Sequence, residues 1–354
     1  MDTESQYVRA LLLEVLQSSE AQSCDGILLS GGLDTSIAAE AMLTMAANKE
    51  TMQLRKAITV TVDPSSNVLA SSNGLFTQKP EDVDYATLIA KNVGLDHHIL
   101  RPTLDELLSG PMMERCVRVL RTFEGMELRN AVVIATALAY AKSIGCRRIC
   151  TGDGTDELFA GYSFMHTLDD TQLREATEKM ARTMRFCAVP LAQELGIEVW
   201  SPYLDPRVID YAVSARGNTK QAKVGEFGGS VHGKLVLRKA FPEVVSAARK
   251  KAAIEYGSGS TVMGALAALL ISDEEFAAET KDALRRYDVV VRSKEHLAYF
   301  RTFRKVVLED KQVLRTMARY KAESKVCCPD CKFQLRGDGS TNYCDVCGLF
   351  PVEC

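Results

Sequence analysis

The chain has 354 residues, of which 46% are hydrophobic and 25% are charged, and its formal net charge is −3. This composition is typical of a globular protein with a sizeable core, and it excludes a protein that binds nucleic acid or acidic lipid through its overall charge. The longest apolar stretches, at residues 131–141 and 262–271, are too short to span a bilayer, and the first ten residues lack the pattern of a secretion signal. We therefore expect a cytoplasmic protein that does not enter membranes.

Strand and helix patterns alternate through the first 150 residues. Four short apolar runs predict strands, at residues 26–30, 57–63, 97–100 and 147–151. Helical spacing of apolar residues surrounds them, at residues 6–17, 35–48, 83–93, 103–123 and 129–144. Such alternation indicates an α/β fold with a doubly wound parallel sheet. From residue 155 to about residue 322 the pattern is nearly all helical, so we expect a helical C-terminal half.

Two glycine turns follow predicted strands, and both carry carboxylates. Residues 28–40 read LLSGGLDTSIAAE, and residues 151–162 read TGDGTDELFAGY. Ligands of a doubly wound sheet bind beyond the carboxyl ends of its strands, so we expect both turns at one site. The alternative for each turn is an ordinary loop with a helix N-cap, and Asp156 stands where it could serve only as such a cap.

The first turn combines groups that bind phosphate with one that repels it. Gly31 and Gly32 let backbone amides approach a ligand, and the following helix points its positive end at the same place. Ser30 and Thr35 add hydroxyl donors. Asp34 has the same sign of charge as a phosphate, so the two need a cation between them, and Mg²⁺ is typically held by carboxylates and phosphate oxygens. No lysine follows the glycines, which excludes the Walker pattern.

Five motifs, in order, resemble the synthetase domain of the asparagine synthetases. Residues 30–36 resemble the pyrophosphate loop of the ATP pyrophosphatase (PP-loop) superfamily, and residues 151–162 resemble the synthetase signature Ser-Gly-Glu-Gly-x-Asp-Glu. The other three motifs are SPYLD (201–205), KLVLRKAF (234–241) and RKKAAIEYGSG (249–259). The resemblance extends from about residue 5 to about residue 320. It implies the adenine-nucleotide α-hydrolase (PP-loop ATPase) type of doubly wound sheet.

The reaction implied by this resemblance is an acyl-adenylation that consumes ATP with Mg²⁺. A carboxylate, aspartate or a similar compound, attacks the α-phosphorus, and pyrophosphate leaves. Ammonia or an amine then displaces AMP and forms an amide. The motif positions imply Mg²⁺ ligands at Asp34 and Asp156, and catalytic roles for Lys251, which would face the charge on the α-phosphate, and for Asp153, which would assist amine attack. The implied contacts to pyrophosphate and nucleotide are Leu28, Ser30, Gly31, Gly32, Asp34, Thr35, Ser36, Val60, Thr151 and Gly152.

Other interpretations of these positions stay open. Lys251 belongs to the run ARKK, which could be a solvated charge run, and Lys234 and Arg238 have the i and i+4 spacing of a helix surface. Asp153 stands where the family usually has Glu, and Trp200 stands where an Arg commonly precedes the family's Pro-Phe-Leu-Asp element, which SPYLD (201–205) resembles. Asparagine synthetases that use glutamine begin with a catalytic cysteine on a separate amidohydrolase domain, whereas position 2 here is Asp2 and the synthetase pattern starts almost at once. We expect that this chain alone does not hydrolyse glutamine. We therefore expect nitrogen from free ammonia, an amine substrate or a separate glutaminase subunit.

The C-terminal segment carries a metal-binding pattern. Two C-x2-C pairs are separated by twelve residues, and they comprise Cys328, Cys331, Cys344 and Cys347. Four thiolates satisfy a tetrahedral Zn²⁺, so we expect a structural zinc ribbon at residues 323–354 after a synthetase domain at residues 1–322. A redox or disulfide role is the alternative. Cys327 and Cys354 are left over, and Cys24, Cys116, Cys146, Cys150 and Cys187 are expected to be packing residues.

Two competing functions belong to other classes. The first is a tRNA-modifying PP-loop ATP pyrophosphatase with a zinc ribbon, since residues 311–336 are locally basic, through Lys311, Arg315, Arg319, Lys321, Lys325, Lys332 and Arg336. The second is a non-catalytic nucleotide-binding module. The motif at residues 151–162 and the presence of Asp34, Asp156 and Lys251 favour the amide synthetase over both.

Overall fold

The computed structural model describes residues 2–47, 49–62, 81–313, 327–335 and 342–352, and these residues form two compact units. The first unit comprises the described parts of Met1–Thr61, Pro80–Leu100 and Ala137–Ser258. The second comprises the described parts of Val62–Lys79, Arg101–Thr136 and Gly259–Cys354. Within the described ranges, no helix is long and apolar enough to cross a membrane.

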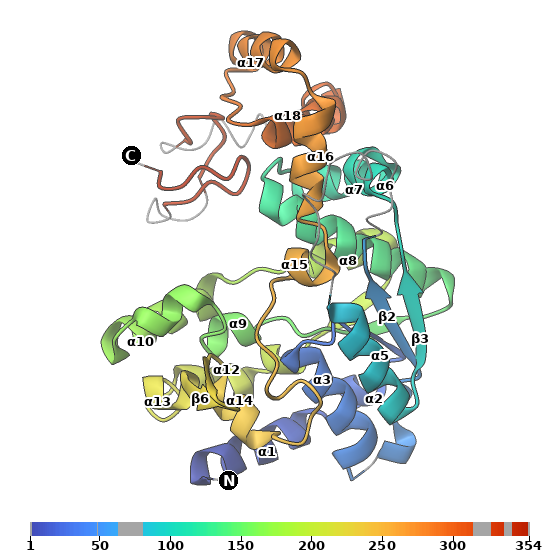
Figure 1. Ribbon diagram of the computed structural model, residues 1–354, viewed down its shortest axis with the longest axis vertical. Coiled ribbons are helices and arrows are strands. Elements are labelled where there is room, and N and C mark those ends of the chain that lie inside the picture. Colours follow the sequence, from blue (N-terminus) through green and yellow to red (C-terminus); the bar gives the residue numbers. More distant parts are fainter. Residues whose placement is uncertain (1, 48, 63–80, 314–326, 336–341, 353–354) are drawn as a thin grey trace. The chain divides into compact units, whose positions relative to one another are not determined.

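A five-stranded parallel sheet organises the first unit (Figure 1). Its strands are β1 (Gly26–Leu28), β2 (Lys56–Val60), β3 (Asp96–Leu100), β4 (Arg148–Cys150) and β5 (Glu198–Trp200). They run in the order β3-β2-β1-β4-β5, which reverses direction at β1 as a doubly wound sheet does. Parallel pairs align Ile27 with Ala57 of β2 and with Cys150 of β4. The α/β fold class and the four expected strands are thus confirmed.

Two features were missed by the expectation of a nearly all-helical chain after residue 155. The fifth strand, β5, pairs with β4 over three residues, which is too short for an apolar pattern to stand out. An antiparallel hairpin joins β6 (Gly225–Phe227) to β7 (Ser230–His232), and its turn is formed by Gly228 and Gly229, both with positive φ. Strand β5 depends on its pairing with β4, and the hairpin depends on its glycine turn. The helical spacing of apolar residues indicates neither of these.

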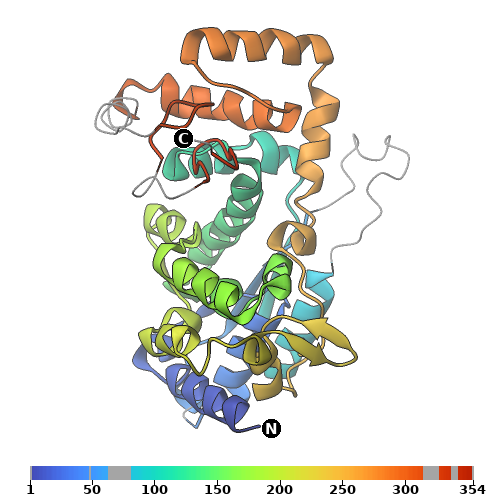
Figure 2. The same ribbon diagram turned by 90° about the vertical axis from the view of Figure 1, so that its left-hand side faces the viewer.

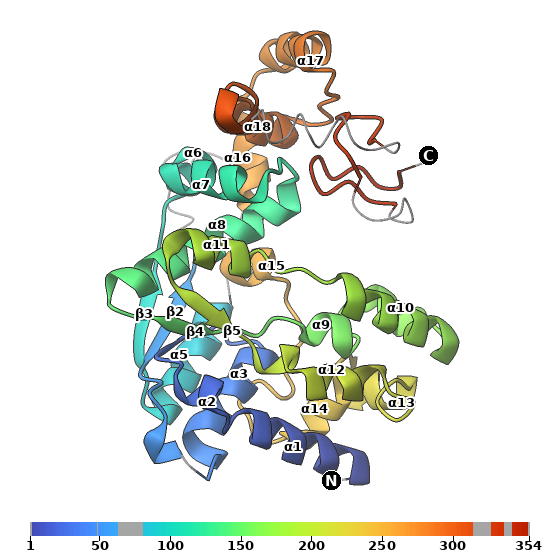
Figure 3. The same cartoon turned by 180° about the vertical axis from the view of Figure 1, so that it is seen from behind.

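Helices cover both faces of the sheet in the first unit. Helix α3 (Leu33–Glu40) contacts β1, and α5 (Asp82–Val93) contacts β2 and β3. Figure 1 shows α5 in front of the sheet, and Figure 3, from behind, shows α11 (Ala188–Leu195) beside β5. The remaining helices of this unit are α1 (Thr3–Val15), α2 (Ser19–Gln22), α9 (Thr155–Leu158), α10 (Asp170–Thr183), α12 (Pro206–Val213), α13 (Lys220–Lys223), α14 (Leu235–Ala240) and α15 (Ile254–Ser258). Helix α8 (Gly125–Ser143) has residues in both units.

Two predicted helices are interrupted for local reasons. The pattern at residues 35–48 forms α3 and then a π-helical turn, Ala41–Met45. The pattern at residues 103–123 divides into α6 (Leu104–Ser109) and α7 (Pro111–Leu120). Pro111 begins α7 at its first position, and a Cβ on Gly110 would lie 2.2 Å from the carbonyl oxygen of Glu106. Proline at a helix start and glycine at a helix end are both well suited to such a break.

Helices and an aromatic core form the second unit. Besides α6 and α7 it contains α16 (Val262–Leu270), α17 (Asp273–Tyr287) and α18 (Lys294–Phe303). Phe123 lies 4.9 Å from Phe303 and 5.4 Å from Phe300, measured between ring centroids, and stacks on His296. Figure 2 shows α16 to α18 in orange, with the cysteine-rich segment beside them in red.

A buried lysine with no ion-pair partner among the described residues lies in the first unit. The Lys223 side chain is 0% exposed, and its ammonium donates to Thr177 Oγ1, Asn218 Oδ1 and the carbonyl of Ala212, at 3.0 to 3.1 Å. No carboxylate among the described residues pairs with it. Burial lowers the pKa of Lys223 to about 7, because the charged form loses its hydration.

We predict that this lysine makes stability depend on pH. An unfolded lysine has a pKa of about 10.4. Between about pH 7 and about pH 10 the unfolded chain therefore binds a proton that the folded chain does not. The free energy of unfolding consequently rises with pH in that window. Lys223→Met removes this dependence. Urea unfolding of both proteins across the window should show the wild type gaining stability relative to the variant as pH rises. A constant difference would contradict the assigned pKa.

Candidate active site and four-cysteine cluster

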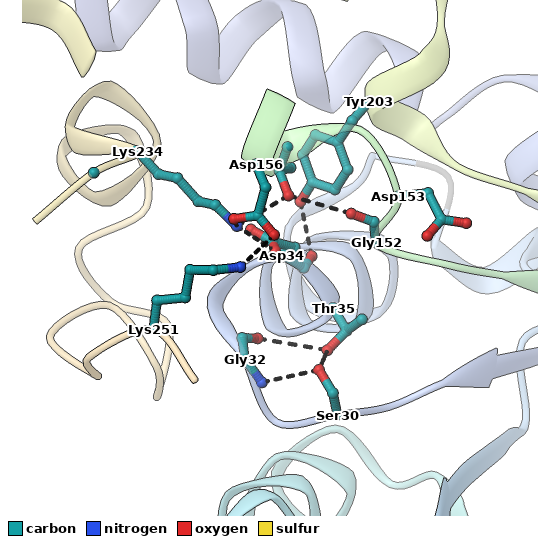
Figure 4. A network of polar contacts seen from close by, with 12 residues as sticks. Ser30, Gly32, Asp34, Thr35, Gly152, Asp153, Asp156, Tyr203, Lys234 and Lys251 are labelled. Carbon is teal, nitrogen blue, oxygen red and sulfur yellow. Dashed lines mark hydrogen bonds and ion pairs between the residues drawn. The ribbon is translucent and has the colours of Figure 1, made fainter. Parts of the chain in front are cut away.

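The first glycine turn is fixed by contacts that leave no room for side chains. Strand β1 ends at Leu28, and α3 begins at Leu33 with Gly32 as its N-cap. Gly31 has φ +70°, and a Cβ on it would lie 2.7 Å from the backbone N of Ala86 and the carbonyl oxygen of Asp82. Ser30 Oγ accepts a hydrogen bond from Gly32 N at 3.2 Å and lies 3.2 Å from Thr35 Oγ1 (Figure 4). The turn is therefore held close to the start of α5.

The second turn lies against the first, as the sequence predicts. It connects β4 to α9, and a Cβ on Gly152 would lie 3.0 Å from Asp34 Cβ. Tyr203, from the SPYLD motif, donates its hydroxyl to the carbonyl of Asp34 at 2.7 Å. Three motifs far apart in the sequence thus meet around Asp34 (Figure 4).

Two lysines pair with the two aspartates of these turns. Lys234 Nζ lies 2.6 Å from Asp34 Oδ2 and 2.8 Å from Asp156 Oδ1, and it donates to Thr155 Oγ1 at 3.1 Å. Lys251 Nζ lies 2.6 Å from Asp156 Oδ2. Figure 4 shows both lysine side chains reaching the carboxylates from the same side. Burial by itself would raise the pKa of Asp156, but the ammonium groups of Lys234 and Lys251 lower it to about 2.

The helix-surface interpretation of Lys234 and Arg238 is wrong. Lys234 is 4% exposed and precedes α14 with φ +57°, and Arg238 is 3% exposed. The Arg238 guanidinium donates to the carbonyl oxygens of Gly233, Ala247 and Arg249. The three residues between them, Leu235–Leu237, are all apolar and all buried. This apolar run is the feature of the sequence that argues against a solvated helix face. Burial would lower the pKa of Lys234, but Asp156 and Asp34 raise it above its ordinary value.

A glycine makes room for this lysine. A Cβ on Gly161 would lie 1.8 Å from Asp156 Oδ1 and 2.6 Å from Lys234 Cε. Gly161 belongs to the second motif, yet the sequence alone gives no reason to single it out. Only the three-dimensional path of Lys234 explains why a side chain is excluded there.

Lys251 is preceded by an anchored arginine. Arg249 Nη2 lies 2.7 Å from Asp82 Oδ1, and its guanidinium carbon lies 4.4 Å from the ring centroid of Tyr85. Burial raises the pKa of Asp82 to about 6, against the opposing effect of Arg249. A Cβ on Gly257 would lie 2.2 Å from Asp82 Oδ2, so the segment after Lys251 also packs on this pair. The sequence analysis did not identify Arg249 or Asp82.

Two further acidic residues lie beside the cluster. Asp153 Oδ2 accepts a hydrogen bond from Thr151 Oγ1 at 2.9 Å, and burial, together with Glu157, Asp34 and Asp156, raises its pKa to about 6 against that bond. Glu157 accepts a hydrogen bond from the Tyr162 hydroxyl at 2.6 Å, and burial raises its pKa. Asp153 therefore holds a proton more readily than an ordinary aspartate does.

The other predicted contact residues differ in what their side chains do. Leu28 and Val60 end β1 and β2, and Thr151 follows β4, so all three lie at the carboxyl edge of neighbouring strands. Ser36 is buried, donates its hydroxyl to the carbonyl of Gly32 at 2.7 Å and lies 2.8 Å from Ser246 Oγ. Its side chain supports the turn from inside.

The four cysteines of the C-terminal segment converge in the second unit. The Sγ atoms of Cys328, Cys331, Cys344 and Cys347 lie within 4.8 Å of one another, and all four residues are buried. Two of the Sγ pairs, 328 with 347 and 331 with 344, are 3.6 Å apart. That distance is far from the roughly 2.05 Å of a disulfide. It is close to the edge of about 3.8 Å for a tetrahedron with Zn–S bonds of about 2.3 Å, so the donor set fits Zn²⁺.

Neighbouring residues of the second unit hold this cluster. Phe123 N donates to the carbonyl of Val346 at 2.8 Å, and Thr122 Oγ1 donates to the carbonyl of Asp345 at 2.7 Å. Arg292 pairs with Asp330 at 2.6 Å and donates to the carbonyl of Cys347. Four thiolates carry four negative charges, and a divalent ion would balance only two of them. The Arg292 guanidinium offsets part of the remainder.

Several sequence predictions about cysteines and the tail can be compared with these positions. Cys24, Cys116, Cys146 and Cys150 are buried packing residues, as expected, and Cys187 is half-buried. Cys327 lies outside the cluster. Cys354 and the proposed boundary at 322/323 lie outside the described residues, as do five of the seven basic residues, all except Lys311 and Lys332. The described structure therefore adds nothing to the tRNA alternative.

We predict one zinc ion per chain, bound by these four cysteines. Elemental analysis of anaerobically purified protein should find one equivalent, and Cys331→Ser should lose most of it. Cys327→Ser is the matched control, since this neighbour lies outside the cluster, and it should retain the metal. Chelation should lower the unfolding temperature of the wild type, because metal binding free energy is folding free energy. Protein without zinc, or equal loss in both variants, would refute the assignment.

Comparison with known proteins gives a consistent picture. The profile of the family "Asparagine synthase" matches residues 15–192, just over half of the chain. Asparagine synthetase [glutamine-hydrolyzing] 2 of Lotus japonicus is 26% identical over 62% of this chain and 35% of its own length. Asparagine synthetase B [glutamine-hydrolyzing] of Escherichia coli (strain K12) is 26% identical over 71% of this chain and 45% of its own length.

A third relative is matched over more of the chain. The probable asparagine synthetase [glutamine-hydrolyzing] of Schizosaccharomyces pombe is 26% identical over 90% of this chain and 59% of its own length. The chain thus spans between about a third and three fifths of the length of these curated relatives. The family match includes both glycine turns, with Asp34 and Asp156. The chain belongs to the asparagine synthase family.

Proposed function

We propose that the chain is an ATP-dependent amide synthetase that forms AMP and pyrophosphate. A carboxylate oxygen of the substrate, aspartate or a similar acid, attacks the α-phosphorus, and the bond from that phosphorus to pyrophosphate breaks. Ammonia or an amine then attacks the acyl carbon, AMP leaves, and the nitrogen releases a proton. The observation that carries this proposal is the meeting of Asp34 and Asp156, from two glycine turns, with Lys251, in a member of the asparagine synthase family.

The residues fit a magnesium ion. Asp34 Oδ1 is buried and accepts no hydrogen bond from the described residues, so it is an oxygen ligand without a partner. Carboxylates beside a phosphate-binding turn are a usual environment for Mg²⁺. Asp34 and Asp156 would hold the ion, which when bound neutralises the charge of the leaving pyrophosphate.

The chain's own groups account for the remaining requirements. The backbone of residues 30–36 and the start of α3 would bind pyrophosphate, with Ser30 and Thr35 as hydroxyl donors. Leu28, Val60, Thr151 and Gly152 would contact the nucleotide at the carboxyl edge of the sheet. Lys251 would stabilise the charge that develops on the α-phosphate, since its ammonium lies beside Asp156 and its side chain is 30% exposed, within reach of a ligand.

Asp153 is the proposed proton acceptor for amine attack. With a pKa of about 6 it is mostly ionised at neutral pH and still basic enough to take a proton from the attacking nitrogen. Asp153 can accept this proton only in its ionised form.

We therefore predict that the rate of amide formation falls as pH drops through about 6, the pKa of Asp153. Asp153→Asn should abolish this dependence on pH, and it should slow amide formation more than pyrophosphate release.

A screen for pyrophosphate release tests the proposal. Amino acids and other small carboxylates are supplied with MgATP and either ammonia or glutamine, and one of them should be converted to its amide with AMP and pyrophosphate in equal amounts. Asp34→Asn and Asp156→Asn should each reduce the rate roughly 100-fold or more, because a metal ligand is lost. Retention of full activity by both variants, or ATP cleavage to ADP and phosphate, would refute the proposal.

Lys251→Ala separates catalysis from binding. We expect kcat to fall by about 100-fold while the Kd for ATP changes less than about threefold, because the charge on the phosphorus is largest in the transition state. Lys250→Ala, the exposed neighbour, is the matched control and should retain activity. Equal rates for wild type and Lys251→Ala would refute a catalytic role for this lysine.

Gly161→Ala tests the packing beneath the site. The new Cβ would overlap Asp156 Oδ1 and approach Lys234 Cε, so the carboxylate must move. We expect affinity for magnesium pyrophosphate, measured by calorimetry, to fall at least about tenfold in a folded protein. Gly125→Ala, where the nearest neighbours of a Cβ lie at 3.4 Å, is the control and should bind normally. Unchanged affinity in Gly161→Ala would show that the site tolerates the displaced carboxylate.

A further inference from the structure

Two aspartates and two lysines of the site form ion pairs with one another. Asp34 and Asp156 carry two negative charges, and Lys234 and Lys251 carry two positive charges within 2.8 Å of them. Among the described residues, three of the four carboxylate oxygens face an ammonium group, and Asp34 Oδ1 does not. A bare divalent cation would thus have to displace an ammonium group to reach most of these oxygens, and it would also have to give up water to bind there.

The two lysines are held very differently. Lys234 is enclosed: its backbone is left-handed, its ammonium contacts two aspartates and Thr155, and Gly161 closes over its side chain. Within the described part of the chain, Lys251 makes one ion pair and lies 5.1 Å from the ring centroid of Tyr162, and its side chain is 30% exposed. A flexible lysine stem on the open side can move to a new partner, whereas the enclosed one cannot move without unpacking the turn.

We propose that Lys234 is a positioning residue that fixes the two aspartates, and that Lys251 keeps a divalent cation out until a pyrophosphate-bearing ligand arrives. The phosphate oxygens then take over the Lys251 ammonium and leave an Asp156 oxygen free for the metal. Metal and nucleotide consequently bind as one unit. This inference rests on the proposed function, because it assumes that Asp34 and Asp156 are the metal ligands.

Equilibrium dialysis with Mn²⁺, using inorganic pyrophosphate as the probe, tests the order of binding. Mn²⁺ on the protein side is compared with a protein-free control at the same pyrophosphate concentration, which corrects for complexes in solution. Wild-type protein should bind Mn²⁺ at least about tenfold more tightly with pyrophosphate than without it. Lys251→Ala should bind Mn²⁺ alone more tightly than wild type does, and Lys250→Ala should match wild type.

Lys234→Met gives an independent readout in thermal unfolding. Without this ammonium, Asp34 loses its ion pair and, among the described residues, the two carboxylates have only Lys251 between them, so the unfolding temperature should fall and Mg²⁺ alone should raise it again. Lys223→Met is the matched control, because it also removes a buried lysine but leaves no carboxylate behind. It should respond to Mg²⁺ no more than wild type does. If Lys234→Met does not fold, the dialysis experiment alone decides.

The outcomes separate the inference from the proposed function. Tight Mn²⁺ binding to wild type without pyrophosphate, or no gain in Lys251→Ala, would overturn the inference and leave the amide synthetase in place. An absence of Mn²⁺ binding in wild type even with pyrophosphate would overturn both, because the aspartates would not be metal ligands.

Discussion

The position of one ammonium group sets the geometry of the candidate site. Lys234 Nζ lies between Asp34 and Asp156, and these come from turns after two neighbouring strands of the sheet. Two carboxylates this close would repel each other in a partly buried site, and removal of one partner from a buried pair typically costs about 3–5 kcal/mol. Gly161 leaves room for this contact, and Lys234, together with Lys251, lowers the pKa of Asp156 to about 2.

The second unit is arranged around a different centre. Its aromatic residues, Phe123, Phe300 and Phe303, pack close to the segments that carry the cysteines, and Phe123 also binds Val346 through its backbone. The four thiolates are therefore joined to a helical core by direct hydrogen bonds. A zinc ion there would have four protein ligands and no open position for water, which fits a structural rather than a catalytic role.

Local patterns predicted the sheet and the turns, and they could not predict the contacts across the sheet. Strands β1 to β4 and the meeting of both glycine turns follow from apolar runs and from the rule for ligand sites in doubly wound sheets. Lys234 was misjudged because i and i+4 spacing is the same on a buried helix and on an exposed one. Arg249 and Asp82 were missed because their pairing joins positions 167 residues apart. Strand β5 is too short to be recognised without its partner.

The hydrogen bonds of Ser246 have a consequence for the order in which the molecule is built. Ser246 Oγ donates to the carbonyl of Gly31 at 2.6 Å, although 215 residues separate the two. During synthesis the sheet strands and both turns emerge long before this serine does. The first glycine turn of a nascent chain thus lacks this hydrogen bond until the polypeptide has passed residue 246, and a contact of such long range closes slowly. The turn therefore reaches its final set of hydrogen bonds late in translation, after the strands on both sides of it have been made.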